Sequence, residues 1–268
     1  MMHIIQFSGG KDSTALVLWA KEQCWPFTTV FCDTGWEHPL TYDYVQYINE
    51  TQLDGKLVTV KSEKYDGLAD LSAKRKIVPS VRMRFCTQEL KVMPFAKWMN
   101  AQDDEATVYQ GIRADESSAR SQMPRRVWEL LYEAWIERPL FDWTAEQVFA
   151  MHKKHGVIPN RLYSMGAKRV GCFPCVMVNK GELRRLSRTT PEIWDQIAKV
   201  ENAVKDGRGF FRADYVPPRF HDATYDKNGK TGTYATWQAV KFYVTRPDQY
   251  DIWDDEPTRC LSVYNLCE

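Results

Sequence analysis

The stretch HIIQFSGGKDSTALVLWAKEQC, residues 3–24, decides the fold. Its first part, Ile4 to Phe7, is a short β-branched and aromatic run that predicts a buried parallel strand. The segment from Thr14 to Cys24 is rich in Ala, Leu and Val and has the length of a helix. A strand, a glycine turn and a helix in this order predict a doubly wound α/β domain with a parallel sheet.

The turn between strand and helix consists of Ser8, Gly9, Gly10, Lys11, Asp12 and Ser13. Glycines let the backbone turn tightly and approach a ligand, and the first N–H groups of a helix, with its dipole, favour a phosphate. The two serine hydroxyls can donate to phosphate oxygens, and the lysine can neutralise them. The turn is not a Walker A loop, because Ile5 stands where that pattern needs its first glycine. The alternative is a plain turn in which Asp12 or Ser13 caps the helix.

Composition limits the class of protein. The chain has 268 residues, 44% of them apolar, which is enough to bury a core. Its net charge of +1 means that any nucleic-acid contact must come from a local patch. No leader pattern and no apolar run near the roughly 18 residues of a membrane span is present, so we expect a cytoplasmic protein without a membrane segment. Seven cysteines in such a chain favour metal or catalytic chemistry over disulfides.

SGGKDS after a first strand resembles the PP-loop of the N-type ATP pyrophosphatases. Three later segments are similar to those of one branch of that superfamily, the phosphoadenosine phosphosulfate reductase family. They are DTG at 33–35 with a T-x-x-Y stretch at 41–44, CT-x-x-LK-x-x-P at 86–94, and G-x-R-x-x-E-S-x-x-R at 111–120. The resemblance covers about residues 3 to 180. It implies an adenine nucleotide α-hydrolase-like fold, with a nucleotide-binding domain at 1–165 and a smaller, mainly helical, cysteine-containing region at 166–268.

The resemblance and the residue chemistry together give a candidate nucleotide site. Asp33 ends a predicted strand, where doubly wound sheets place ligand contacts, although a strand-end turn residue is the alternative. Arg113 follows the stretch VYQG, and its planar fork suits a phosphate or sulfate. The predicted nucleotide-binding residues are Ser8, Gly9, Gly10, Lys11, Asp12, Ser13, Asp33, Gly111 and Arg113, with Lys11, Asp12 and Arg113 catalytic. The predicted substrate or oxyanion rim is Arg84, Lys91, Glu116 and Arg120.

A Cys-x-x-Cys pair, Cys172 and Cys175, lies on a Gly- and Pro-punctuated turn that can present two thiolates to one metal. A [4Fe-4S] cluster, a zinc ion and plain thiols are all open. The resemblance favours the cluster, because iron–sulfur members such as the DNA phosphorothioation sulfurtransferases combine a CT-segment cysteine with a GC-x-x-C pair. The predicted ligands are Cys86, Cys172, Cys175 and Cys267, with Cys260 as the alternative fourth, or three ligands and an open iron site. Cys24 and Cys32 are expected in the core.

The later parts of the chain are less informative. We expect a helix or a strand within 128–141, a helix from Thr144 to His155 with an N-cap, and a helix opened by 190–192 with one apolar face. Lys180, Arg184, Arg185 and Arg188 form a basic face that is either solvated or a site for a phosphate backbone or protein.

The resemblance implies attack on the α-phosphate of ATP, which gives an adenylated intermediate and pyrophosphate, with Mg²⁺ assisting. We therefore favour an ATP-dependent adenylating sulfurtransferase whose acceptor is a nucleotide or nucleic acid. A protein donor of sulfur or electrons is a further partner to test. The alternatives are a phosphoadenylyl-sulfate reductase that releases sulfite, and a non-catalytic nucleotide-binding iron–sulfur module. The tail reads NLCE, which departs from the ECGLH segment of the assimilatory reductases.

Overall fold

Two compact units share the chain. The structure is a computed structural model that describes residues 1–80, 82–204, 209–227 and 229–246. The first unit contains Met1–Glu63 and Thr87–Cys172, and the second contains Lys64–Cys86 and the described residues that follow Cys172. The domain division predicted after residue 165 stays a prediction. Cys260 and Cys267 lie outside the described residues.

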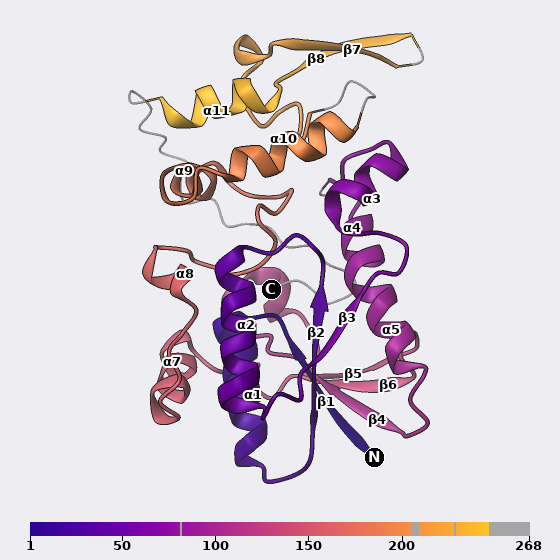
Figure 1. The fold of residues 1–268 in the computed structure, drawn as a ribbon, viewed down its shortest axis with the longest axis vertical. Coiled ribbons are helices and arrows are strands. Elements are labelled where there is room, and N and C mark those ends of the chain that lie inside the picture. The colour runs from indigo at the N-terminus through magenta and orange to yellow at the C-terminus, as the bar shows by residue number, and fades with distance from the viewer. Residues whose placement is uncertain (81, 205–208, 228, 247–268) are drawn as a thin grey trace. The chain divides into compact units, whose positions relative to one another are not determined.

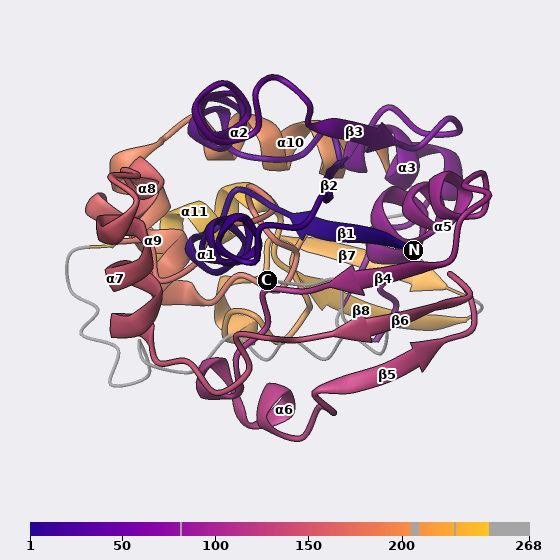
Figure 2. The ribbon, with the colours of Figure 1, turned by 90° about the horizontal axis from the view of Figure 1, so that it is seen from below.

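A six-stranded sheet organises the first unit, with the strand order β3-β2-β1-β4-β6-β5. Its strands are β1 (Met2–Phe7), β2 (Thr28–Asp33), β3 (Val58–Lys61), β4 (Ala106–Tyr109), β5 (Arg126–Glu129) and β6 (Ala134–Glu137). All neighbours pair in parallel except β5, which is antiparallel to β6. Figure 2 shows the strands side by side in this order. The predicted doubly wound α/β fold is confirmed.

Helices cover both faces of this sheet. They are α1 (Lys11–Glu22), α2 (Pro39–Gln52), the π-helical turn η1 (Gln88–Val92), α5 (Met93–Met99), the 3-10 turn η2 (Ala114–Glu116), α6 (Ser118–Ser121), α7 (Ala145–Lys154) and α8 (Arg161–Ser164). The predicted helix after Thr144 is confirmed as α7: the Thr144 hydroxyl accepts from the Gln147 N–H, and the Gln147 side chain accepts from the Thr144 N–H. The region 126–137 is a hairpin, β5–β6, rather than a helix.

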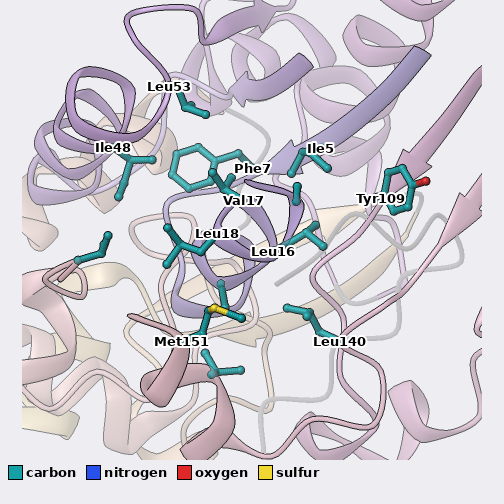
Figure 3. Packing of buried hydrophobic residues seen from close by; sticks show 14 of the residues in the cluster. Ile5, Phe7, Leu16, Val17, Leu18, Ile48, Leu53, Tyr109, Leu140 and Met151 are labelled. Carbon is teal, nitrogen blue, oxygen red and sulfur yellow. The ribbon is translucent and has the colours of Figure 1, made fainter. Parts of the chain in front are cut away.

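Alternation along β1 divides the core into two clusters. Ile5 and Phe7 pack with α1, α2 and α7 on one face (Figure 3), whereas Ile4 packs with Phe95 of α5 on the other. Figure 1 shows α1, α2 and α7 on the opposite side of the sheet from α5. The sheet is therefore buried on both faces, as a parallel sheet requires. Positions from which side chains can reach a ligand are therefore expected at the carboxyl ends of the strands.

The second unit is mainly helical. It contains α3 (Leu68–Arg75), α9 (Lys180–Thr189), α10 (Ile193–Ala203), the 3-10 turn η3 (Pro218–Phe220), the hairpin β7 (Ala223–Lys227) and β8 (Lys230–Tyr234), and α11 (Trp237–Thr245). The apolar face predicted for α10 is buried. Part of the basic face of α9 is used inside the unit, because Arg184 donates to the Val244 carbonyl and Arg185 pairs with Glu182 at 2.6 Å.

The structure places the two cysteines, Cys24 and Cys32, that were expected in the core. Cys24 is exposed and has a φ of +56°, since α1 ends at Glu22, so its placement in the core was wrong. Cys32 lies within β2, where burial raises the pKa of its thiol to about 12. No helix among the described residues is long and apolar enough to cross a membrane.

Candidate functional site

The loop between β1 and α1 is shaped by Gly9. Its φ of +78° is a left-handed conformation that side chains rarely adopt. A Cβ at this position would lie 3.0 Å from the Cγ2 atom of Thr41 and 3.2 Å from that of Val45, both on α2. Gly9 therefore allows the loop to turn close to α2. The turn places Gly10 as the N-cap of α1, in extended backbone without a side-chain cap, so the helix begins at Lys11.

Serine hydroxyls hold the loop closed. Ser13 Oγ accepts from the Ser8 N–H at 3.2 Å and lies 3.0 Å from Ser8 Oγ. The Gly10 carbonyl accepts from the hydroxyls of Ser13 and Thr14, at 3.1 and 2.9 Å. The alternative predicted for this turn, a side-chain cap from Asp12 or Ser13, is absent from α1. Asp12 and Ser13 have other partners.

Asp12 joins two cations. Its Oδ2 lies 2.7 Å from Lys11 Nζ, and its Oδ1 lies 2.5 Å from Arg113 Nε. Asp12 and Arg113 are each 3% exposed, so these charges are held together away from water. Both carboxylate oxygens of Asp12 are occupied by cations, which makes Asp12 a residue that positions Lys11 and Arg113.

The chain after β4 passes directly against the loop. A Cβ on Gly111 would lie 2.9 Å from the carbonyl carbon and oxygen of Asp12 and 3.0 Å from the Ser13 nitrogen. This close approach explains the glycine before Arg113. Burial by itself would lower the pKa of Arg113, but the carboxylates of Asp12, Glu116 and Asp115 together outweigh it and raise the pKa. Arg113 is therefore a fixed cation beside the loop.

Three residues that the sequence reasoning did not assign to the site brace the loop from behind. His152 Nε2 donates to the Lys11 carbonyl at 2.8 Å, and Asn160 Nδ2 donates to the Gly9 carbonyl at 3.2 Å. The Lys11 N–H donates to the Tyr163 hydroxyl at 2.9 Å, and Lys11 Nζ lies 5.5 Å from the centre of the same ring. Burial lowers the pKa of His152, which favours the neutral ring as donor. Nothing in the local sequence of residues 158–163 indicates a contact with the loop.

Asp33 ends β2 and shapes the next turn. Its Oδ1 accepts from the Gly35 N–H at 2.9 Å and from the Tyr42 hydroxyl at 2.8 Å. Burial and this hydrogen bond raise the pKa of Tyr42. Asp33 therefore performs the turn role that was its alternative interpretation, and a contact with nucleotide stays a prediction.

Glu37 is buried beyond that turn. It accepts from the Thr34 hydroxyl at 2.9 Å, and the predicted rim residue Lys91 lies 3.7 Å away. The backbone of Glu37 also forms an antiparallel bridge with Cys172. Cys172 and Lys91 are thus both placed beside the turn that follows β2.

The remaining predicted residues divide between the units. Glu116 Oε2 accepts from the Arg113 N–H at 2.9 Å and from Arg120 Nη1, so these two rim residues lie beside Arg113. Arg120 is only 5% exposed, and it therefore does not form an open rim. Arg84, Cys86 and Cys175 belong to the second unit, and their roles stay predictions.

The predicted metal ligands do not form a recognisable centre within the described part of the chain. There, no group of three or more His, Cys, Asp or Glu side chains is arranged to hold a metal ion. Cys86, Cys172 and Cys175 are each half-buried. The fourth predicted cluster ligand, Cys267 or Cys260, lies outside the described residues, so the cluster and a bound Mg²⁺ stay predictions.

Comparison with known proteins decides the family. The profile of the phosphoadenosine phosphosulfate reductase domain matches residues 2–178. The chain belongs to this family. An uncharacterized 37.8 kDa protein of Escherichia phage 186 is 32% identical, over 100% of this chain and 97% of its own length. The adenosine 5'-phosphosulfate reductase of Allochromatium vinosum is 31% identical over 141 residues, which are 52% of this chain and 50% of that protein.

A solved structure shares the fold. The phosphoadenylyl-sulfate reductase of Candida auris, in a phosphate complex, matches with a TM-score of 0.52 and 21% identity, over 64% of this chain and 81% of that one. As a member of the phosphoadenosine phosphosulfate reductase domain family, the chain is an enzyme of that family's kind, and the family connects it with nucleotides and sulfur metabolism. The resemblance inferred from the SGGKDS loop and the later motifs is thereby confirmed at the level of family and fold.

Proposed function

We propose that this chain activates an acceptor with ATP and then transfers sulfur to it. The proposal rests on one observation, the arrangement of Lys11, Asp12 and Arg113 on the glycine loop after β1. Two cations held by one buried carboxylate at the start of a helix suit a polyphosphate, since the helix dipole and both cations favour negative charge. Adenosine 5'-phosphosulfate, with one phosphate and one sulfate, carries fewer negative charges than ATP for these cations to neutralise.

The residues have distinct roles in the proposed reaction. An acceptor oxygen attacks the α-phosphorus of ATP, the bond to the bridging oxygen breaks, and pyrophosphate leaves with the electron pair. Lys11 neutralises charge that develops on the leaving group, and Arg113 holds a phosphate oxygen. Asp12 keeps both cations in place. In a second step, hydrosulfide attacks the acceptor atom that bears the adenylated oxygen: a bond to sulfur forms, the bond to that oxygen breaks, and AMP leaves with the electron pair.

No step above depends on an iron–sulfur cluster or on a protein-bound metal, because the described residues alone provide no group of three or more metal ligands. Magnesium enters with ATP as part of the substrate. The cluster predicted at Cys86, Cys172, Cys175 and either terminal cysteine would supply or hold the sulfur. That part of the prediction is independent of the adenylation step and has its own test by iron analysis. A nucleic acid is one acceptor class to examine.

A second candidate function is reduction of an adenylyl sulfate with release of sulfite. It is favoured by the similarity to the Allochromatium vinosum adenosine 5'-phosphosulfate reductase. In that reaction the substrate is already adenylated, so ATP is not consumed. The two candidates therefore differ in substrate and in product.

The test offers the purified chain three substrates in separate reactions: ATP with Mg²⁺, sulfide and a nucleic acid as the acceptor; adenosine 5'-phosphosulfate with a thiol; and phosphoadenosine phosphosulfate with a thiol. Products are quantified as AMP, pyrophosphate and sulfite. The proposal predicts equal amounts of AMP and pyrophosphate from ATP, and their loss in Lys11→Ala. Lys21→Ala is the matched control, because Lys21 lies in the last turn of the same helix and contacts Gln52. Sulfite from either phosphosulfate, with no pyrophosphate from ATP, would replace the proposal by the reductase.

A further inference from the structure

Two buried arginines lie beyond the loop site, at the C-terminal end of β6. Arg138 directly follows β6 and is 2% exposed. Arg120 lies on α6 and is 5% exposed. Arginine is rarely buried this completely without partners, because removing its charge from water is costly. Each N–H group of these two guanidinium groups should therefore have an acceptor.

Among the described residues, a count of the hydrogen bonds leaves three N–H-bearing nitrogens without acceptors. Arg138 Nη1 donates to the Pro124 carbonyl, whereas its Nε and Nη2 are buried and have no hydrogen-bond partner. Arg120 Nη1 donates to Glu116, whereas its Nη2 is buried without a partner. Nearly all buried polar groups in proteins are satisfied, so three such nitrogens on two neighbouring cations point to a missing acceptor.

The charges are also unbalanced. Glu116 is the carboxylate that pairs with Arg120, and its Oε2 already accepts from the Arg113 N–H. Arg138 has no carboxylate partner among the described residues, and the other nearby arginine, Arg113, is taken by Asp12 and Asp115. Burial, with a contribution from Arg120, lowers the pKa of Arg138 to about 10, which still leaves it charged near neutral pH. One positive charge remains uncompensated.

We propose that Arg120 and Arg138 bind a tetrahedral oxyanion, sulfate or phosphate, through these N–H groups. Planar guanidinium forks match such anions in geometry and charge. The site is separate from the glycine loop: β6 lies two strands from β1 in the sheet, which is about 10 Å at about 4.8 Å per strand. The oxyanion is either a free inorganic ion or a phosphate or sulfate group of the substrate. The inference goes beyond the proposed function and holds for either reaction.

Access to the site requires a local movement, because the unpaired nitrogens are covered. The segment that can move is short: α6 has four residues, and residues 122–125 are exposed apart from the half-buried Met123. Segments with few buried contacts open at low cost. Binding should therefore stabilise this segment as well as the fold.

The test measures thermal unfolding in sodium sulfate, sodium phosphate and sodium chloride at equal ionic strength. Wild type is compared with Arg138→Met, which keeps an unbranched apolar stem and removes the guanidinium group with its charge. Arg125→Met is the matched control, because Arg125 is an exposed residue of the same segment that pairs with Asp142. Lys11→Ala removes anion binding at the loop. Sulfate and phosphate stabilise folded proteins in general, because they are excluded from the protein surface. We therefore expect them to raise the melting temperature of wild type, Arg125→Met and Lys11→Ala by more than that of Arg138→Met.

Without oxyanion, Arg138→Met should be as stable as wild type or more so, because it removes a buried unpaired charge. A lower melting temperature with an unchanged sulfate shift would overturn the proposal and make Arg138 a purely structural donor to Pro124. Equal shifts in sulfate and chloride would overturn it as well. Should Arg138→Met not fold, Arg138→Lys, which keeps the charge and loses the fork, must show a reduced sulfate shift.

Adenosine 5'-phosphosulfate and AMP distinguish the two sources. A shift with the phosphosulfate that exceeds the AMP shift and disappears in Arg138→Met assigns the oxyanion to the substrate. A shift with inorganic sulfate alone assigns it to a free ion. Both results support the site. Its failure leaves the loop proposal intact, because loss of ATP turnover is measured in Lys11→Ala and not at Arg138.

Discussion

The substitution Asp12→Asn tests whether one buried carboxylate holds Lys11 and Arg113 in place. Asp12 and Asp115 both pair with Arg113, but the Asp12 side chain is 4% exposed and that of Asp115 is 62% exposed. At an effective dielectric constant of about 20, each of the two cations on Asp12 contributes about 4 kcal/mol of attraction at about 4 Å. Desolvation offsets much of this sum, and breaking a buried pair costs about 3–5 kcal/mol.

Asp12→Asn should therefore lower the free energy of unfolding by about 3 kcal/mol, because the amide keeps an acceptor for Arg113 but turns a donor towards Lys11. Asp115→Asn should lower it by less than about 1 kcal/mol, since exposed pairs contribute little. Urea unfolding of both variants measures the difference, and nucleotide titration should show weaker binding only in Asp12→Asn. Equal effects of the two substitutions on stability would refute the role given to Asp12.

Three further predictions concern the loop, its support and the cysteines. Gly111→Ala should lower the free energy of unfolding by about 1–3 kcal/mol and weaken ATP binding, because its Cβ would clash with the Asp12 backbone. Gly156→Ala is the control: its Cβ would meet no atom within 4 Å, but its φ of +65° is strained for alanine, so it should lower stability and leave ATP binding unchanged. Burial depresses the pKa of His152 in the folded state, so the stability that the neutral ring contributes is present above about pH 6.5 and is lost as pH falls towards the folded pKa. When the free energy of unfolding in urea is measured from about pH 5 to 8, it should therefore change less with pH in His152→Gln than in wild type. Anaerobically purified protein should carry about four irons and sulfides per chain, fewer in Cys172→Ser and unchanged in the exposed Cys24→Ser; iron-free wild type would end the cluster prediction.

Local sequence was sufficient for the sheet and the loop. The buried run before Ser8, the glycines and the helix after them follow from periodicity and from glycine's freedom at positive φ, and β1, the turn at Gly9 and α1 appear where they were expected. The pairing of Thr144 with Gln147 is likewise a local signal. The end of α1 was placed too late, because no strong stop signal separates Glu22 from Cys24.

Contacts between residues that are far apart in the sequence could not be predicted from local patterns. His152, Asn160 and Tyr163 reach the loop over more than a hundred residues of chain, and a buried His or Asn carries no local mark of its partner. Arg138 was missed for the same reason: in sequence it is one arginine before a proline, and only the sheet brings it beside Arg120. Arg120 itself was assigned to an open rim because the motif gives its position and not its burial.

The most direct test of the central claim is calorimetric titration of ATP with Mg²⁺ into wild type, Lys11→Ala and Lys21→Ala. If the loop after β1 is the nucleotide site, wild type and Lys21→Ala bind one ATP per chain with equal affinity. Lys11→Ala then binds at least about tenfold more weakly, which corresponds to about 1.4 kcal/mol, the size of a charge-assisted hydrogen bond. Unchanged affinity in Lys11→Ala, or no ATP binding by any of the three, would contradict the account.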